Sequence, residues 1–181
     1  MHPPNDNGSS RRDVLTGAAA SVVSASVLTP ASAQARRPIE QEARMTGTNL
    51  SSEVRTFFEK YSEAFASYDG RQIAALYHMP TVTMRGDASI HCLQSRDDLA
   101  GFFQTVVDTY RKDGYAGGTF ENLEVIPIGG RSVLASMDWV MLRSDGSIIR
   151  KWRQSYNLVR VGTGWQILVS TFHLSRDATA A

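Results

Sequence analysis

The chain has 181 residues, of which 42% are hydrophobic, so it can bury one core, and no second block of composition marks another domain. Its formal net charge of +1 excludes the strongly basic surface that binds nucleic acids or anionic membranes. The single cysteine, Cys92, excludes an intramolecular disulfide. We expect Cys92 to be a small buried hydrophobe, because no His-Asn or His-Asp pattern accompanies it.

Residues 1–33 have the features of an export signal. The run Ser10-Arg11-Arg12-Asp13-Val14-Leu15 resembles the twin-arginine motif, and a moderately apolar stretch follows it. Ala31-Ser32-Ala33 has the small-x-small form of a signal peptidase site. The apolar stretch is shorter than the roughly 20 residues of a membrane-spanning helix. We therefore expect cleavage after Ala33, no membrane anchor afterwards, and a periplasmic or secreted protein.

Residues 34–50 lack clear periodicity and are predicted to be a linker to a folded domain at residues 51–175, with residues 176–181 as a tail. From Ser52, apolar side chains recur at helical spacing and predict an amphipathic helix of about 16 residues. Asp69 can cap a second, short helix that continues through Tyr77 and is closed by Pro80. The stripe of the first helix consists of Val54, Phe57, Phe58, Tyr61, Phe65 and Tyr68.

A short hairpin and a third helix come next. Residues 81–84 and 89–93 are predicted to be strands on either side of Arg85-Gly86-Asp87-Ala88. Ser95-Arg96-Asp97-Asp98 has the form of a capping box and begins a helix with an apolar stripe from Leu99 to Tyr110. Residues 119–128 then return as a strand.

Three further strands, at residues 132–143, 148–161 and 165–173, are joined by turns at Asp145-Gly146 and Gly162-Thr163-Gly164. Alternation of side chains gives them one apolar and aromatic face, which we expect the helices to cover. That face holds Val133, Ala135, Met137, Trp139, Met141, Ile148, Arg150, Trp152, Gln154, Tyr156, Leu158, Leu168, Ser170 and Phe172. The outer face is predicted to meet solvent or another subunit, and it carries an aliphatic patch of Val140, Ile149, Val159, Ile167 and Val169.

This order of elements resembles the nuclear-transport-factor-2-like (NTF2-like) superfamily, which includes SnoaL-like cyclases and ketosteroid isomerases. The resemblance is carried by Tyr61-Ser62-Glu63-Ala64-Phe65, Asp69, Ile73-Ala74-Ala75-Leu76-Tyr77, the hairpin from Thr81, and Gly164-Trp165-Gln166-Ile167. It implies an α+β, cystatin-like cone in which a strongly bent antiparallel sheet wraps around three N-terminal helices. It also implies an apolar pocket at the open end of the cone and frequent dimerisation.

The resemblance carries over only part of the ketosteroid isomerase machinery. Tyr61 matches the tyrosine that donates to the oxyanion in those enzymes, and Tyr156 takes the place of a protonated aspartate and still offers a donor. Arg85 stands where the general-base aspartate would be, and an arginine stays protonated at neutral pH. The resemblance therefore implies donors without the isomerase base, which argues against steroid isomerase activity.

A candidate pocket combines aromatic rings with polar groups: Tyr61, Arg85, Trp139, Trp152, Gln154 and Tyr156. Two phenols, an amide and a guanidinium in an aromatic cavity suit a ligand that carries a carbonyl or carboxylate on an apolar body. The alternative is that the rings fill the core and their polar ends bond to backbone or water.

Two histidines, His91 and His78, are candidates for a catalytic base with Tyr61 or Tyr156 as donor, and a structural role is the alternative for both. Hairpin register also predicts a row of Asp138, Arg153 and His173 across three strands, which we interpret as a cross-strand ion pair of little energetic weight. No spacing typical of a metal or cofactor site is present, so neither a metal nor a cofactor is predicted.

Three hypotheses about function follow. The leading one is an exported, homodimeric domain that binds a small, largely apolar molecule. The second is a SnoaL-like isomerase, cyclase or dehydratase that works by acid-base chemistry in the same pocket. The third is a dimerisation module with a filled core.

Overall fold

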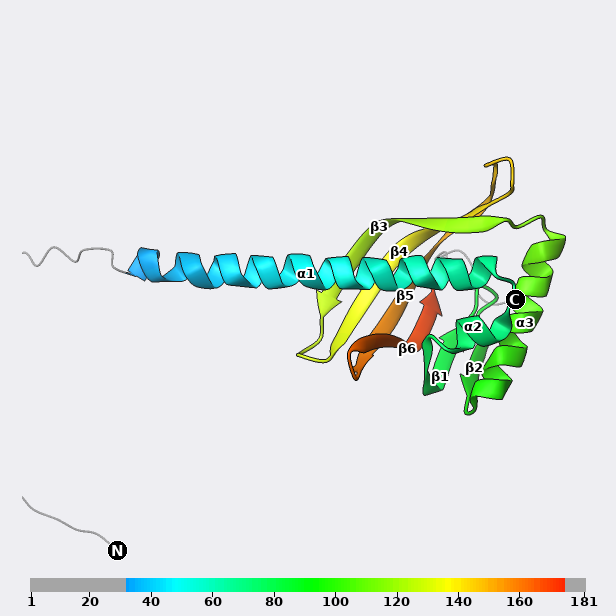
Figure 1. Ribbon diagram of the computed structural model, residues 1–181, viewed down its shortest axis with the longest axis horizontal. Coiled ribbons are helices and arrows are strands. Elements are labelled where there is room, and N and C mark those ends of the chain that lie inside the picture. The colour runs from blue at the N-terminus through cyan, green and yellow to red at the C-terminus, as the bar shows by residue number, and fades with distance from the viewer. Residues whose placement is uncertain (1–31, 175–181) are drawn as a thin grey trace, which may run out of the picture.

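The computed structural model describes residues 32–174, with the side chains of residues 49–174; the twin-arginine run and residues 176–181 lie outside the described residues. The helices are α1 (Ser32–Ala66), α2 (Gly70–Ala74) and α3 (Arg96–Lys112). The strands are β1 (Tyr77–Met84), β2 (Ile90–Leu93), β3 (Gly117–Pro127), β4 (Ser132–Leu142), β5 (Ile148–Val161) and β6 (Gly164–Phe172). The helices and the short strands β1 and β2 thus precede the four strands β3 to β6, and the class is α+β, as predicted (Figure 1).

The first helix is longer than predicted. It begins at Ser32 rather than near Ser52, so residues 34–50, which we assigned to a linker, are helical. Hydrophobic periodicity marks a helix that packs against a core. Figure 1 shows α1 lying along the sheet and extending beyond it at its N-terminal end. A helix that extends beyond a sheet needs no hydrophobic stripe, so the sequence pattern does not mark this part of α1. The predicted stripe is buried from Val54 to Tyr61, whereas Phe65 and Tyr68 are partly buried and Tyr68 lies beyond the end of the helix.

The second helix is shorter than predicted. Asp69 caps it as expected, because its carboxylate accepts a hydrogen bond of 2.8 Å from the backbone N–H of Arg71. The helix ends at Ala74, however, and Tyr77 begins β1. Pro80 lies inside β1, after a cis peptide bond, and does not close the helix. Pairing with β6 explains the difference, since the N–H of Ile167 donates to the carbonyl of Leu76 at 3.0 Å.

The strands form one six-stranded sheet in the order β2-β1-β6-β5-β4-β3. The pairs β1–β2, β3–β4, β4–β5 and β5–β6 are antiparallel. β1 and β6 run parallel, so the sheet is mixed rather than wholly antiparallel as predicted. A parallel pair requires a crossover connection, and α3 together with the strands β3 to β5 provides it.

The turn of the long hairpin forms where the sequence predicts it. Gly146 adopts a φ of 81°, which a residue without Cβ tolerates, and Arg143 N–H donates to the carbonyl of Ser147 at 2.9 Å. Leu142 pairs with Ile148, whereas Met141 pairs with Arg150, so Ile149 is an extra residue that shifts the register by one. Beyond this bulge Asp138 lies opposite Arg153, the pairing that the sequence predicts. Strand β6 also contains a bulge. Asn157 pairs with Val169 and the next residue, Leu158, pairs with Ile167, so Leu168 has no partner on β5.

The bulge in β6 reverses two of the predicted faces. Leu168 is the extra residue, so Ile167 turns into the core, where it is fully buried, and Leu168 turns to the outer face. Val140 is also buried, at 3% exposure. The aliphatic patch predicted on the outer face therefore loses Val140 and Ile167 and retains Ile149, Val159 and Val169, which are half-buried.

The core lies between the inner face of the sheet and the three helices. Cys92 is not part of it, contrary to our expectation, and is exposed because β2 is a short edge strand. Among the helices that the structure describes, none has the length and apolar character needed to span a membrane.

Candidate functional site

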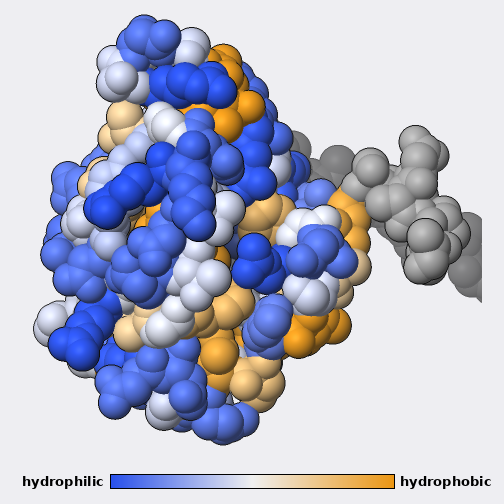
Figure 2. Space-filling view, turned by 90° about the vertical axis from the view of Figure 1, so that its right-hand side faces the viewer, coloured by the Kyte–Doolittle hydropathy of each residue, from blue (hydrophilic) through white to orange (hydrophobic). Residues whose placement is uncertain are grey.

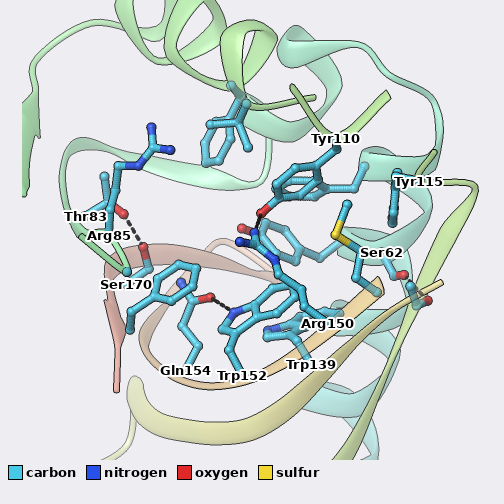
Figure 3. A pocket seen from close by; sticks show the side chains of 18 of the residues that line it. Ser62, Thr83, Arg85, Tyr110, Tyr115, Trp139, Arg150, Trp152, Gln154 and Ser170 are labelled. Atoms are coloured by element: carbon cyan, nitrogen blue, oxygen red, sulfur yellow. Dashed lines mark hydrogen bonds between the residues drawn. The ribbon is translucent and has the colours of Figure 1, made fainter. Parts of the chain in front are cut away.

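A cavity of about 360 Å³ lies between the inner face of the sheet and helices α1 and α3 (Figure 3). All six side chains that the sequence predicted for a pocket line it: Tyr61, Arg85, Trp139, Trp152, Gln154 and Tyr156. In Figure 2, which views the molecule from the α3 side, hydrophobic surface is visible in hollows between hydrophilic residues. The structure thus brings the predicted set together around one space.

Phenol groups occupy the deep end of this cavity. The hydroxyls of Tyr61, on α1, and Tyr77, on β1, are 2.7 Å apart and buried. The indole Nε1 of Trp139, on β4, donates to the hydroxyl of Tyr156, on β5, at 2.8 Å. Burial raises the pKa of Tyr61, Tyr77 and Tyr156 above the ordinary value for tyrosine. These phenols are therefore neutral and serve as hydrogen-bonding groups rather than as bases.

Aromatic rings form two facing walls. On the sheet, Trp152 and Phe172 are stacked, with ring centroids 5.7 Å apart and planes 9° apart. On α3, Phe102 and Phe103 meet edge to face at 5.3 Å. Walls of this kind favour a ligand with a flat or otherwise apolar body.

A few neutral polar groups interrupt the aromatic wall. The Nε1 of Trp152 donates to the Gln154 carbonyl oxygen at 3.0 Å, so the amide nitrogen of Gln154 is left to donate elsewhere. Next to it, the Ser170 hydroxyl donates to Thr83 Oγ1 at 2.8 Å (Figure 3). Gln154, Ser170 and Thr83 are buried, so the lining offers hydrogen bonds in an environment of low polarity.

Charged groups gather at the exposed mouth of the cavity. Arg150, on β5, donates to the Tyr110 hydroxyl at 2.8 Å, and its guanidinium lies 5.1 Å from the ring centre of Tyr110 and 4.7 Å from that of Trp152. The guanidinium of Arg85, in the turn after β1, lies 5.5 Å from the ring centre of Phe102. Cation–π contacts of this kind hold both guanidiniums in place.

Asp87 is the carboxylate among the lining residues. Its Oδ1 accepts hydrogen bonds from the Ser89 hydroxyl at 2.5 Å and the Ser89 N–H at 3.0 Å, and these bonds lower the pKa of Asp87. Within residues 49–174, no carboxylate forms an ion pair with Arg85 or Arg150. The mouth therefore carries two cations and one anion.

Neither histidine proposed as a base lines the cavity. His91 lies on the edge strand β2, with its Nε2 3.2 Å from the Ser89 hydroxyl and its ring 5.1 Å from that of Phe102. His78 faces the other side of the sheet, where it borders a separate depression together with Leu168. The structure thus brings Tyr61 and Tyr156 together but places both histidines outside their site.

The row across the outer face forms as an ion pair. Arg153 donates to Asp138 at 3.1 Å and lies 3.0 Å from Glu124. The Asn122 amide donates to the other oxygen of Asp138 at 2.7 Å, and the two bonds lower the pKa of Asp138. His173 completes the row through its backbone N–H, which donates to the Arg153 carbonyl at 3.0 Å, while its ring bonds to Ser155. The predicted register is correct, and the pair lies away from the cavity.

The pocket predicted from the sequence leaves out several lining residues with polar ends, among them Tyr77, Tyr110 and Arg150. The sequence pattern predicts Tyr77 as a helix residue, whereas it begins β1. Strand alternation had placed Arg150 on the aromatic face, which is the signal that could have identified it. Tyr110 had been assigned to the apolar stripe of α3. Within residues 49–174, no group of three or more His, Cys, Asp or Glu side chains could hold a metal ion.

The comparison with protein families identifies the domain. Residues 52–175 match the family described as NTF2-like protein (DUF6841). The chain belongs to this NTF2-like family. The matched range covers all of the residues that line the cavity and the six strands. No protein with a curated description matches the chain.

Solved structures confirm the NTF2-like, cystatin-like fold. An NTF2-like protein with a cystatin-like fold from Novosphingobium aromaticivorans is 17% identical, with a TM-score of 0.60 over 77% of this chain and 90% of that one. Aln2 from a Streptomyces species is 14% identical, with a TM-score of 0.59 over 70% and 91%. A domain of unknown function with a cystatin-like fold from Nostoc punctiforme is 19% identical, with a TM-score of 0.54 over 70% and 78%. At these identities the likeness concerns the fold alone.

Proposed function

We propose that this NTF2-like domain binds a small, largely apolar molecule in its aromatic cavity. The observation that carries the proposal is the cavity itself, with about 360 Å³ of space between aromatic walls. Ligand sites typically enclose about 300–1,000 Å³, whereas packed cores leave few voids larger than a water molecule. The volume therefore supports a pocket over the alternative of a filled core.

The chemistry of the lining supports binding over catalysis. Its buried phenols are held neutral by raised pKa values, and its carboxylate, Asp87, lies at the exposed mouth with a lowered pKa. A general base is most effective when its pKa is near the operating pH. The SnoaL-like alternative keeps Tyr61 and Tyr156 as donors, but its candidate bases, His91 and His78, do not line the cavity.

Native mass spectrometry of the protein, purified gently from its own host, tests the proposal. We expect a non-covalent small-molecule adduct that disappears under denaturing conditions. Val106→Trp should abolish the adduct by filling the cavity from α3, because Val106 is buried and lines the space. Thr109→Trp, on the exposed side of the same helix, is the matched control and should retain it.

A second variant separates loss of the site from loss of the fold. Trp152→Ala removes one aromatic wall and should weaken binding without filling the space. Thermal unfolding of each variant checks that the domain remains folded. An adduct that survives in folded Val106→Trp would place the ligand elsewhere and contradict the proposal.

We also propose that the domain acts outside the cytoplasm. The run from Ser10 to Leu15 and the small residues Ala31-Ser32-Ala33 support export by the twin-arginine pathway. Replacing both Arg11 and Arg12 by lysine should retain the protein in the cytoplasm. N-terminal sequencing of the exported protein should begin at Gln34, and an intact N-terminus in the periplasm would refute the cleavage.

A homodimer is the assembly we propose for the domain, through the outer face of the sheet. Ile149, Val159 and Val169 remain on that face and are half-buried in a single chain. The native mass gives the test, because a dimer should appear at twice the chain mass and should dissociate in Val159→Lys.

A further inference from the structure

We propose that the ligand is a small monocarboxylic acid whose carboxylate is held at the mouth by Arg85 and Arg150, with its apolar body inside the cavity. This inference rests on the proposed ligand-binding function and names the chemical class of the ligand. It starts from a feature that a purely apolar ligand leaves unexplained, namely two guanidiniums in the lining of an aromatic cavity (Figure 3).

Both arginines have hydrogen-bonding capacity to spare. A guanidinium has five N–H donors and no acceptor. Within residues 49–174, Arg150 donates to the Tyr110 hydroxyl, and no hydrogen bond from the side chain of Arg85 is found. Neither group is paired with a carboxylate in that part of the chain. A planar carboxylate accepts two parallel N–H bonds from such a group, which suits an acid better than a neutral carbonyl.

The position of Arg150 is fixed before a ligand arrives. Its guanidinium lies between the rings of Tyr110 and Trp152, 5.1 Å and 4.7 Å from their centres, and it bonds to the Tyr110 hydroxyl. A side chain held in this way loses little further freedom on binding an anion. Trp152 also forms part of the aromatic wall, so the acid group and the apolar body of one ligand would contact neighbouring surfaces.

The charge at the mouth selects a monoanion. Arg85 and Arg150 contribute +2 and Asp87 contributes −1, so the charged lining residues sum to +1. Two hydrogen bonds from Ser89 hold Asp87 in its ionised form. One carboxylate neutralises the remaining charge, whereas a phosphate dianion would leave an excess of one negative charge beside Asp87. The observations therefore favour a carboxylic acid over a phosphate ester.

Matched pairs of probes test the inference on the full chain. We would titrate the protein with 2-naphthoate and 2-naphthamide, and with benzoate and benzamide, by isothermal calorimetry at low ionic strength. Each pair has the same apolar body and differs in its charge. We expect each acid to bind at least about tenfold more tightly than its amide, because hydrogen bonds between a guanidinium and a carboxylate are stronger than those to a neutral carbonyl. Arg85→Gln and Arg150→Gln should each remove most of that preference, so that each acid binds with nearly the same affinity as its amide.

Arg71→Gln is the matched control, because Arg71 is exposed on α2, lies outside the lining and changes the net charge equally. It should leave both probes unaffected. Equal binding of acid and amide by the unaltered protein would overturn the carboxylate assignment while leaving the cavity as a binding site. Absence of binding by every probe, acid or amide, would overturn the ligand-binding proposal and this inference together. Binding of inorganic phosphate more tightly than benzoate would assign the arginines to a phosphate instead.

Discussion

Trp139 donates a 2.8 Å hydrogen bond from its indole nitrogen to the hydroxyl of Tyr156, and both side chains are almost fully buried at the deep end of the cavity. They come from the adjacent strands β4 and β5. Each large ring therefore satisfies the polar group of the other, so that two groups that prefer water can lie inside an aromatic core.

Tyr156→Phe should destabilise the domain by about 1–3 kcal/mol, because it leaves the Trp139 N–H buried without its acceptor. Urea denaturation followed by circular dichroism measures the change. Trp139→Phe, made in the original protein, is the control. The double variant should lose less stability than the sum of the losses in the two single variants, because the two side chains share one hydrogen bond. A Tyr156→Phe protein as stable as the original would show that the bond contributes nothing net.

Alkaline pH should unfold the domain early. Burial raises the pKa of Tyr61, Tyr77 and Tyr156 above the value of about 10 that tyrosine has in an unfolded chain. The unfolded chain therefore loses protons first, and the stability present below about pH 10 is lost as the pH rises further, by about 1.4 kcal/mol per pH unit for each such tyrosine.

Urea unfolding at a series of pH values above neutrality checks this expectation, and tyrosinate absorbance shows when the phenols ionise. Burial also raises the pKa of Tyr110 and Tyr115, so five tyrosines contribute to the slope. Tyr77→Phe is the matched variant and should reduce the slope above pH 10 by about one fifth, since it removes one of these five groups. A flat stability curve up to about pH 11 would mean that these phenols are not protected from ionisation in the folded state.

Much of the cavity could be predicted from the sequence because strand alternation is a local geometric rule. Trp152 and Tyr156 lie on one face of β5 because they are four residues apart. Trp139 lies opposite Trp152 on the same face, as predicted, although the bulge at Ile149 is needed to give that register. The helix stripe that carries Tyr61 follows from a similar rule, the period of 3.6 residues.

The missed features depend on contacts between distant segments. Tyr77 continues the apolar spacing of Ile73, so a helix is the local expectation, and only the pairing of β1 with β6 makes it a strand residue. Ile167 is turned into the core by a bulge that no residue pattern announces. Neighbouring residues in a strand point to opposite faces of the sheet, so His78 points outward because Tyr77 points into the cavity. A sequence pattern that predicts Tyr77 in a helix therefore cannot show on which side of the sheet His78 lies.

Gly70, the first residue of α2, packs directly against the backbone of α3. A Cβ at this position would lie 2.3 Å from the Ala100 carbonyl oxygen and 2.6 Å from the Gln104 nitrogen, both of which are backbone atoms. Gly70→Ala should therefore destabilise the domain by about 1–3 kcal/mol, as overpacking does. Gly101→Ala is the control, since nothing lies within 4 Å and a helical alanine should stabilise by about 0.5–1 kcal/mol. Thermal unfolding compares the two, and equal melting temperatures would show that the helices can separate without cost.

A substitution at Asp138 tests whether the row of Asp138, Arg153 and His173 on the outer face has a functional role. Asp138→Asn should cost less than about 1 kcal/mol at neutral pH, because the pair with Arg153 is partly exposed and screened by solvent. The pKa of Asp138 is lowered by Asn122 and Arg153, so its contribution is present above about pH 4 and is lost as the pH falls through the lowered pKa. Urea unfolding should therefore show a deficit for the variant at neutral pH that disappears in acid. Binding of 2-naphthoate should not change, since Asp138 does not line the cavity, and a loss of binding would assign the outer row to the site.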